Sequence, residues 1–230
     1  MRPLSRAGER ASADFTSTQS TRAGPRHARN QPPMKPARTR LLPAARRAQL
    51  VDHAIACFAE HGIARATQAQ VAARAGVSVS AVYAYFRTRA DLVDAVLAAV
   101  AAAIVDMVTG ALATPAPMPA TLARLARHTA DMARDQPDSV RVWLDWSSGV
   151  RTDVWPQFLA LQQRLQAMVE AVLVADATPD RRSRSAARLF VGGAHTLALM
   201  RFEGIGDADL ALFIDQMVGG VLAALARDGA

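Results

Sequence analysis

Apolar residues recur at spacings of three and four along nearly the whole chain from residue 43 onward. Leu50, Val51, Ala54, Ile55 and Phe58 form the first such stripe. This spacing places side chains on one face of an α-helix, whereas a half-buried strand needs alternation with period two, which is not found in this sequence. The sequence therefore predicts an all-α fold of about nine helices.

Capping residues, glycines and prolines set the expected helix boundaries. Thr67, Ser78 and Thr88 are good N-cap residues, and Gly62 and Gly76 are good C-caps. The Pro-rich segment 114–119 is expected to be a loop, as is 203–206 with its two glycines. The predicted helices are 43–61, 68–75, 79–85, 89–113, 120–134, 137–146, 153–174, 181–202 and 207–226.

The segment from Gln68 to Tyr85 has the spacing of a helix-turn-helix. Ala72 provides a small residue where two short helices would touch, and Gly76 can open the turn with a positive φ. Val71, Ala75, Val77 and Val82 would fill the interior. An ordinary helical hairpin with a glycine turn shares Gly76 alone, but the full set of residues favours a helix-turn-helix.

A helix-turn-helix presents its second helix to the DNA major groove. Small and hydroxylated residues at the start of that helix permit a close approach to base edges, while Thr67 and the tyrosines can donate to phosphates. The candidate DNA contacts in and beside these two helices are Thr67, Gln68, Ser78, Val79, Ser80, Ala81, Tyr83, Ala84, Tyr85 and Arg89.

Charge is distributed unevenly along the chain. Residues 1–90 hold 15 Lys and Arg against 4 Asp and Glu, whereas residues 91–230 hold 12 against 16. A basic N-terminal part suits a protein that neutralises DNA phosphates. A basic tail with no such role would inflate the count, but residues 41–90 keep six basic and two acidic residues.

The segment 67–92 resembles the DNA-binding signature of the TetR family of transcription regulators. It reads TQAQVAARAGVSVSAVYAYFRTRADL, with the Ala-Gly-Val-Ser turn and the Tyr-Phe pair of that family. The segments 37–43, 77–80, 85–94 and 140–158 are also similar to the LuxR/HapR/SmcR-type quorum-sensing master regulators, a subgroup of the family.

This resemblance implies a division of the chain into three parts. Residues 1–36 are expected to be a disordered basic tail, 37–91 the DNA-binding domain, and 92–230 a helical domain for ligand binding and dimerisation. It further implies that Arg38 and Arg40 enter the minor groove, as an N-terminal arginine arm does in the subgroup. Ala84 departs from the subgroup's usual Asn, which suggests a different operator preference, and Gly76 replaces its usual Gln.

Three tryptophans lie within thirteen positions of a chain that is poor in aromatics. An apolar cavity is a common ligand site, but aromatic and Met side chains at helical spacing more often form ordinary core. Trp146 and Trp155 are expected to be structural. By analogy with the subgroup, the candidate pocket residues are Ile104, Met107, Val108, Trp143, Phe158, Gln162 and Ala194.

The last two predicted helices carry apolar residues on more than one face. A pair of helices this apolar needs a partner surface, and in the family two such pairs form a four-helix dimer interface. The candidate interface residues are Leu189, Gly193, Leu197, Leu210, Phe213, Ile214, Met217 and Val221. The arginines from 181 to 188 are expected to be a solvated face.

Other classes of protein are less consistent with this sequence. Its histidines are scattered and no nucleophile motif or phosphate loop is present, which argues against an enzyme. The single Cys57 forms no internal disulfide, and neither cofactor nor metal is expected. No secretory signal or uninterrupted apolar run of about 18 residues is expected, which indicates a cytoplasmic protein that spans no membrane.

The expected partners are double-stranded DNA and a second copy of the chain, and an apolar cavity would admit a small apolar ligand. Two alternatives remain beside a quorum-type global regulator. One is a local repressor of an efflux or catabolic gene that a ligand releases from DNA. The other is an interaction protein that has lost DNA binding, which the intact turn and the arginine arm disfavour.

Overall fold

The computed structural model describes residues 42–150, 153–175 and 177–226, all of which are helix, turn or loop. The helices are α1 (Pro43–His61), α2 (Gln68–Ala75), α3 (Val79–Tyr85), α4 (Arg89–Leu112), α5 (Met118–Asp135), α6 (Pro137–Ser147), α7 (Trp155–Val174), α8 (Arg181–Phe202) and α9 (Asp207–Ala226). The predicted all-α fold is confirmed. The predicted tail and the arm residues Arg38 and Arg40 lie outside the described residues.

Local signals in the sequence explain where these helices begin. Thr67, Ser78 and Thr88 each accept a hydrogen bond from a backbone N–H in the first turn of the following helix. Thr67 and Thr88 form full capping boxes with Gln70 and Asp91. These bonds satisfy backbone donors that a helix start leaves free. The predicted boundaries of α2, α3 and α8 match those observed.

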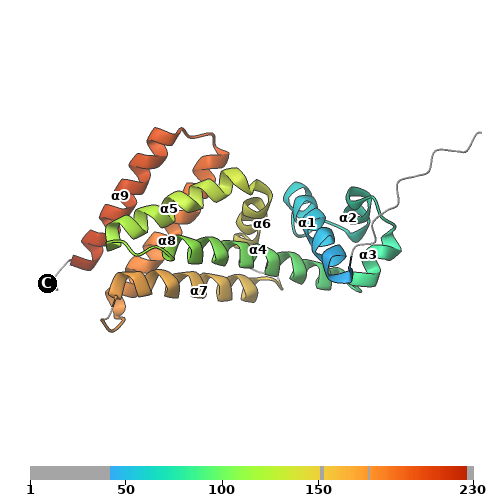
Figure 1. Cartoon of the computed structure of the whole chain (residues 1–230), viewed down its shortest axis with the longest axis horizontal. Coiled ribbons are helices and arrows are strands. Elements are labelled where there is room, and N and C mark those ends of the chain that lie inside the picture. Colours follow the sequence, from blue (N-terminus) through green and yellow to red (C-terminus); the bar gives the residue numbers. More distant parts are fainter. Residues whose placement is uncertain (1–41, 151–152, 176, 227–230) are drawn as a thin grey trace, which may run out of the picture. The chain divides into compact units, whose positions relative to one another are not determined.

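Helix α4 connects the two parts of the described chain. Helices α1, α2 and α3, the head, pack together at one end of α4, and α5 to α9, the body, surround the rest of it (Figure 1). Helix α4 packs on α1, α5, α6 and α7, while α8 packs on α5, α7 and α9. The head and body share one continuous hydrophobic core. The predicted domain boundary at 91/92 falls within α4 and stays a prediction.

Two helices are long and apolar enough to cross a membrane by length and composition. These are α4 and α9, whose best windows have mean hydropathies of 2.2 and 1.6. This criterion admits charged residues, and Asp94 and Asp106 interrupt the apolar run of α4, so the expectation of no uninterrupted run is not contradicted. Nine residues of α4 are buried in the protein core. Packing within this fold accounts for the apolar character of α4.

Candidate functional site

The turn between α2 and α3 has the geometry that the sequence predicts. Gly76 adopts φ +64° and ψ +35°, the left-handed conformation that glycine accepts without strain. The backbone N–H of Val77 then donates to the carbonyl of Ala72 at 3.0 Å. Ala72 and Val82 are fully buried where the two helices meet. The turn therefore sets the crossing of α2 and α3.

Helix α3 presents a polar and small-residue face to solvent. Ser78, Val79, Ser80, Tyr83 and Ala84 are exposed, with Val79 and Tyr83 at 42% and 48%. The Ser78 hydroxyl lies 2.9 Å from that of Ser80. On the opposite side of the helix, Val82 anchors α3 in the core. The exposed face is free to meet a flat or grooved partner.

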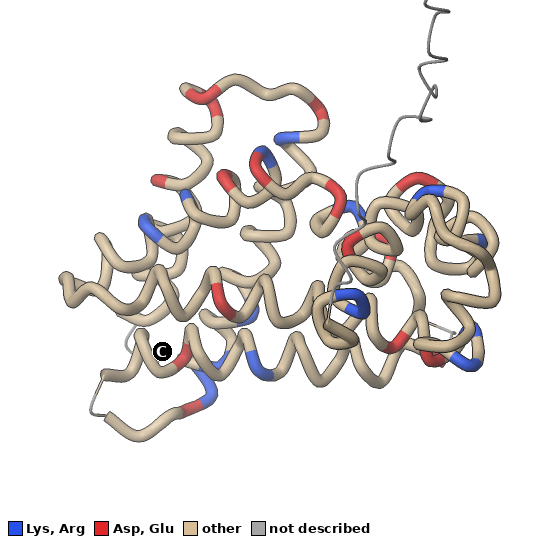
Figure 2. Tube along the Cα trace, turned by 45° about the vertical axis from the view of Figure 1, so that its right-hand side comes forward, with Lys and Arg blue, Asp and Glu red and all other residues tan. Residues whose placement is uncertain are grey.

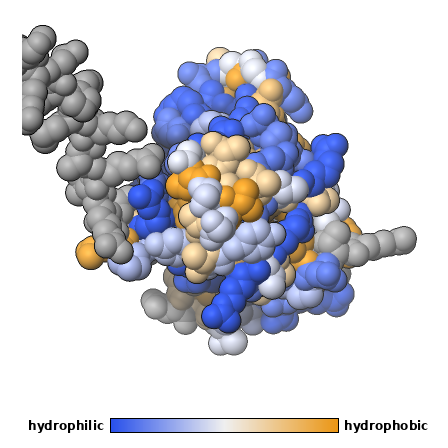
Figure 3. All heavy atoms as spheres, turned by 90° about the vertical axis from the view of Figure 1, so that its right-hand side faces the viewer, coloured by the Kyte–Doolittle hydropathy of each residue, from blue (hydrophilic) through white to orange (hydrophobic). Residues whose placement is uncertain are grey.

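Figure 3 views the molecule from the end at which the head lies in Figure 1. Hydrophilic residues cover most of the face, and a small apolar patch lies within them. A hydrophilic surface with a few apolar contacts is typical of a site that meets phosphates and base edges.

Two predicted DNA contacts, Gln68 and Arg89, form hydrogen bonds within the chain. Gln68 is only 5% exposed, and its Nε2 donates to the carbonyls of Phe86 at 2.6 Å and Thr88 at 3.3 Å. Arg89 donates to the carbonyls of Ala66 and Ile63. Gln68 thus holds α2 against the segment between α3 and α4, and Arg89 holds the α1–α2 loop. Burial removes Gln68 from the candidate DNA contacts, whereas Arg89 is exposed and its contact with DNA stays a prediction.

The other predicted contacts vary in how freely they reach solvent. The Thr67 hydroxyl is exposed but already accepts from Gln70 N and bonds Gln70 Oε1 at 2.8 Å. Ala81 and Tyr85 are partly buried, and Tyr85 packs against the core. These three residues therefore lie at the margin of the exposed face.

Basic and acidic residues are interspersed in the head (Figure 2). Arg74 pairs with Glu60 at 2.8 Å, and the Arg47 guanidinium lies 5.0 Å from the centroid of the Phe86 ring. Arg87 lies two residues beyond the end of α3 and is exposed, so it is a cation near the end of this helix that the sequence analysis missed. Its position near the end of α3 was readable from the sequence.

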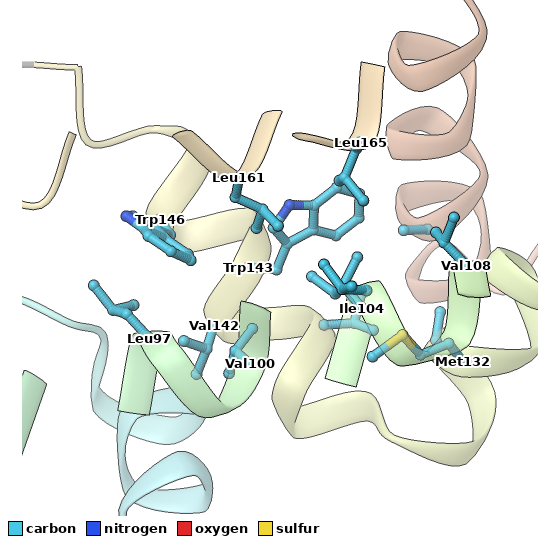
Figure 4. Close-up of a cluster of buried hydrophobic side chains, with 14 of the residues drawn as sticks. Leu97, Val100, Ile104, Val108, Met132, Val142, Trp143, Trp146, Leu161 and Leu165 are labelled. Carbon is cyan, nitrogen blue, oxygen red and sulfur yellow. The ribbon is translucent and has the colours of Figure 1, made fainter. Parts of the chain in front are cut away.

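A second candidate site is an apolar cavity in the body, with a volume of about 40 Å³. Five predicted pocket residues line it: Ile104, Met107, Val108, Trp143 and Ala194. The lining that the sequence analysis missed comprises Leu125, Thr129, Met132, Val140, Leu165, Val169, Phe190, Val191 and Ala198. Figure 4 shows Trp143 among Leu161, Leu165 and Ile104, with Met132 and Val108 nearby.

The other two predicted pocket residues do not line the cavity. Phe158 packs between two tryptophans, 5.1 Å from the Trp155 ring and 5.8 Å from that of Trp146. Gln162 is partly buried, and its Oε1 has no hydrogen-bond partner among the described residues. The three-aromatic cluster supports the expectation that Trp146 and Trp155 are structural.

His195 lies beside the cavity, with its ring centroid 4.7 Å from that of Trp143. Burial lowers the pKa of His195 from its usual 6.5, because the apolar surroundings disfavour the charged imidazolium. The cavity lining contains no Lys, Arg, Asp, Glu or His, and the hydroxyl of Thr129 donates to the Leu125 carbonyl. The described surroundings therefore offer no counter-charge to an ionic ligand.

The C-terminal helix pair presents a groove lined by residues of α8 and α9. Leu189, Gly193, Phe213 and Met217 line it, together with Arg188, Gly192, Thr196, Gln216 and Gly220. A Cβ on Gly193 would lie 2.2 Å from the Met217 sulfur, so the glycine permits the close approach of α9. Leu189 and Leu212 are among the exposed large apolar residues of this pair.

Four residues predicted for the dimer interface lie in the chain's own core instead. Leu197, Leu210, Ile214 and Val221 are at most 4% exposed. Helix α9 packs on α5 as well as on α8, which uses one of its apolar faces within the chain. Only the remaining face is available to a partner.

Comparisons with known proteins agree with this geometry. Residues 50–96, which include the whole of α2 and α3, match the model of bacterial regulatory proteins of the tetR family. Residues 50–96 therefore carry a DNA-binding domain of the TetR family, as the resemblance in the sequence implied. The chain as a whole is similar to transcriptional regulators of this type.

The HTH-type transcriptional regulator LuxR of Vibrio harveyi is 28% identical over 178 residues, which cover 75% of this chain and 87% of LuxR. A TetR-like transcriptional regulator from Rhodococcus sp. RHA1 has the same fold, with a TM-score of 0.69 at 19% identity. The match covers 82% of this chain and all of that structure.

A third relative is the transcriptional regulator FadR from Bacillus subtilis in complex with stearoyl-CoA. Its TM-score is 0.58 at 17% identity, with 77% of this chain and 98% of FadR covered. Each of these relatives is described as a transcriptional regulator rather than as an enzyme.

Proposed function

We propose that this chain is a TetR-family regulator that acts as a homodimer and reads near-palindromic DNA operators in a sequence-specific way. The exposed face of α3 carries this proposal, since Val82 anchors the helix while Ser78, Val79, Ser80 and Tyr83 stay exposed. Two such helices enter successive major grooves about one helical turn apart. Tyr83 and Arg87 contact phosphates at the edge of each half-site.

Arg38 and Arg40 supplement these contacts in the flanking minor grooves. This part of the proposal rests on the sequence resemblance, because both residues lie outside the described residues. A narrow minor groove is electronegative and attracts arginine.

The dimer forms through the groove between α8 and α9. Leu189 and Leu212 are 52% and 56% exposed, and Phe213 and Met217 are partly buried beside them. Exposed apolar patches of this kind mark association surfaces on soluble proteins. The proposed interface therefore consists of Leu189, Gly193, Phe213 and Met217 from the sequence prediction, with Leu212, Thr196 and Gln216 added.

A ligand-released local repressor is the second candidate, and the cavity beside Trp143 supports it. Because no charged residue lines the cavity, its ligand would be uncharged and largely apolar. The volume of about 40 Å³ is far below that of ordinary ligand pockets. Binding would therefore require Met107 or Met132 to move, which their flexible side chains allow.

The likeness to LuxR supports a global regulator of the quorum-sensing type. We assign the protein to the cytoplasm, where its DNA lies, and we assign it no enzymatic activity.

Selection from a pool of genomic fragments tests the proposed function. Purified full-length protein is incubated with the pool, bound fragments are sequenced, and affinity for the enriched site is measured against salt. Enrichment of one near-palindromic motif, with a salt dependence that weakens in Arg38→Ala and Arg40→Ala, is the expected result. Many promoters among the fragments indicate a global regulator, and one site beside a single gene indicates a local repressor.

Failure to enrich any motif at low salt would contradict DNA reading by α3. The second candidate has its own test in the same assay. Release of the enriched DNA by an uncharged apolar compound, but not by its carboxylate analogue, would support it. Decanol and decanoate are a suitable matched pair of probes.

A further inference from the structure

The loop between α1 and α2 is held from outside by two side chains. Gly62 ends α1 with φ +81°, a left-handed conformation that favours glycine, and turns the backbone of Ile63 toward α6. The N–H of Ile63 donates to Asp145 Oδ2 at 2.7 Å, and its carbonyl accepts from Arg89. Ile63 is therefore hydrogen-bonded to α6 through its N–H and to α4 through its carbonyl.

The α6 contact links this loop to the cavity. Val140 and Trp143 of α6 line the cavity, and Asp145 follows Trp143 by two residues. Helix α6 packs closely on α1. It is a short helix of 11 residues, so a displacement at Trp143 moves Asp145 with it.

Asp145 differs from the other carboxylate of α6. Asp138 lies in the first turn and pairs with Arg141 at 3.2 Å on the exposed side of the same helix. Among the described residues, Asp145 is the α6 carboxylate bonded to the head. The Cβ position of Gly62 lies only 3.6 Å from Asp145 Oδ2, which shows how closely the loop approaches that carboxylate.

We propose that Asp145 is a positioning residue for operator recognition, which holds the α2–α3 unit at a fixed orientation to the body through the Ile63 N–H. The inference rests on the proposed dimeric reading of DNA and assigns a determinant of its geometry. In a dimer, the orientation of each head sets the distance between the two α3 helices. A firmly held head therefore accepts one spacing of half-sites and rejects others.

Loss of this contact frees the heads to reach several spacings. Each head would then lose more conformational entropy on binding, because the loop is no longer fixed in the free protein. Hydrogen bonds to a charged group are stronger than neutral ones, but Asp145 is exposed and water competes with the bond. Without the Asp145 carboxylate, we expect affinity for the best spacing to fall about fivefold. The ratio of affinities between the best spacing and the others should fall by at least the same factor.

The experiment uses the full-length protein and duplexes that carry the half-site enriched by the wild type. The spacer between two half-sites is shortened or lengthened by one and by two base pairs, and affinity is measured for each duplex. The variants are Asp145→Ala and Asp145→Ser, which remove the acceptor or shorten it. Asp145→Asn keeps a side-chain oxygen that can accept from Ile63, and Asp138→Asn is the matched control on the same helix.

We expect wild type, Asp145→Asn and Asp138→Asn to discriminate sharply between spacings, while Asp145→Ala and Asp145→Ser bind all spacings with similar affinity. Thermal melting should change little in every variant, because the side chain is exposed. Faster amide hydrogen exchange at Ile63 in Asp145→Ala is expected in parallel.

The outcomes separate two failures. Wild-type spacing preference in Asp145→Ala, with an Ile63 amide that exchanges faster, overturns the positioning role alone. A wild-type protein that shows no spacing preference overturns the dimeric reading of DNA, and the positioning role with it.

Discussion

The α2–α3 unit of the head and the C-terminal helix pair are both helical hairpins, but they are specified in different ways. In the α2–α3 unit, both helix starts have a side-chain cap and the turn has a glycine at φ +64°. In α8 and α9, apolar residues cover several faces, and the choice of face depends on what packs against it. Local chemistry therefore determines the head, while tertiary and quaternary packing determine the pair.

The largest effect is expected from a comparison of two substitutions, one on the buried face of α9 and one on its exposed face. Leu210→Asp places an unpaired carboxylate in the core at a position 3% exposed, so it should cost more than about 4 kcal/mol and abolish cooperative melting. Leu212→Asp lies at a position 56% exposed, so it should keep the helical circular dichroism but halve the mass in light scattering. A folded dimer in Leu212→Asp would contradict the assigned interface.

Gly76 provides the next test, in the head. Its Cβ position has open space, so Gly76→Ala adds only the strain of a left-handed alanine, about 1 to 2 kcal/mol. Gly110→Ala is the matched control, because Gly110 lies within α4 with equally open space. It should stabilise the protein by about 0.5 to 1 kcal/mol. Urea denaturation measures both, and equal effects at the two positions would argue against the strained turn.

Loss of a cap should have a smaller effect. Thr88→Ala removes the acceptor for the Asp91 N–H and opens the capping box at the start of α4. The free energy of unfolding should fall by about 1 kcal/mol, while Thr88→Ser should keep most of it. An unchanged midpoint of urea denaturation in Thr88→Ala would show that packing, rather than capping, sets this boundary.

The smallest effect concerns His195 in the body. Its pKa is lowered by burial, so the unfolded chain binds the proton more readily than the folded one. The contribution of His195 to stability is complete above about pH 6.5 and declines as the pH falls through the lowered folded value. Melting temperatures between pH 7.5 and pH 5 should fall less in His195→Gln than in the wild type. Melting temperatures that fall equally with pH in both proteins would show that His195 does not contribute to the pH dependence of stability.

The sequence allowed the helices and the turn to be predicted because caps and glycines act within a few residues. It did not allow the roles of Gln68 and Arg89 to be predicted, since their partners are carbonyls up to 26 residues away. The same applies to Phe158, which joins two tryptophans rather than the cavity. For Leu197 and Leu210, helical spacing marked an apolar face without showing whether the same chain or a second copy covers it.

In the proposed mechanism, two recognition helices read two half-sites together. Its most direct test is a titration of the enriched duplex, beside a duplex in which one half-site is scrambled, with fluorescence anisotropy and native mass measurement. We expect two chains on each intact duplex and a loss of affinity of at least about a hundredfold on scrambling, because several base contacts are lost together. Equal affinity for both duplexes, or a single chain on the intact one, would contradict it.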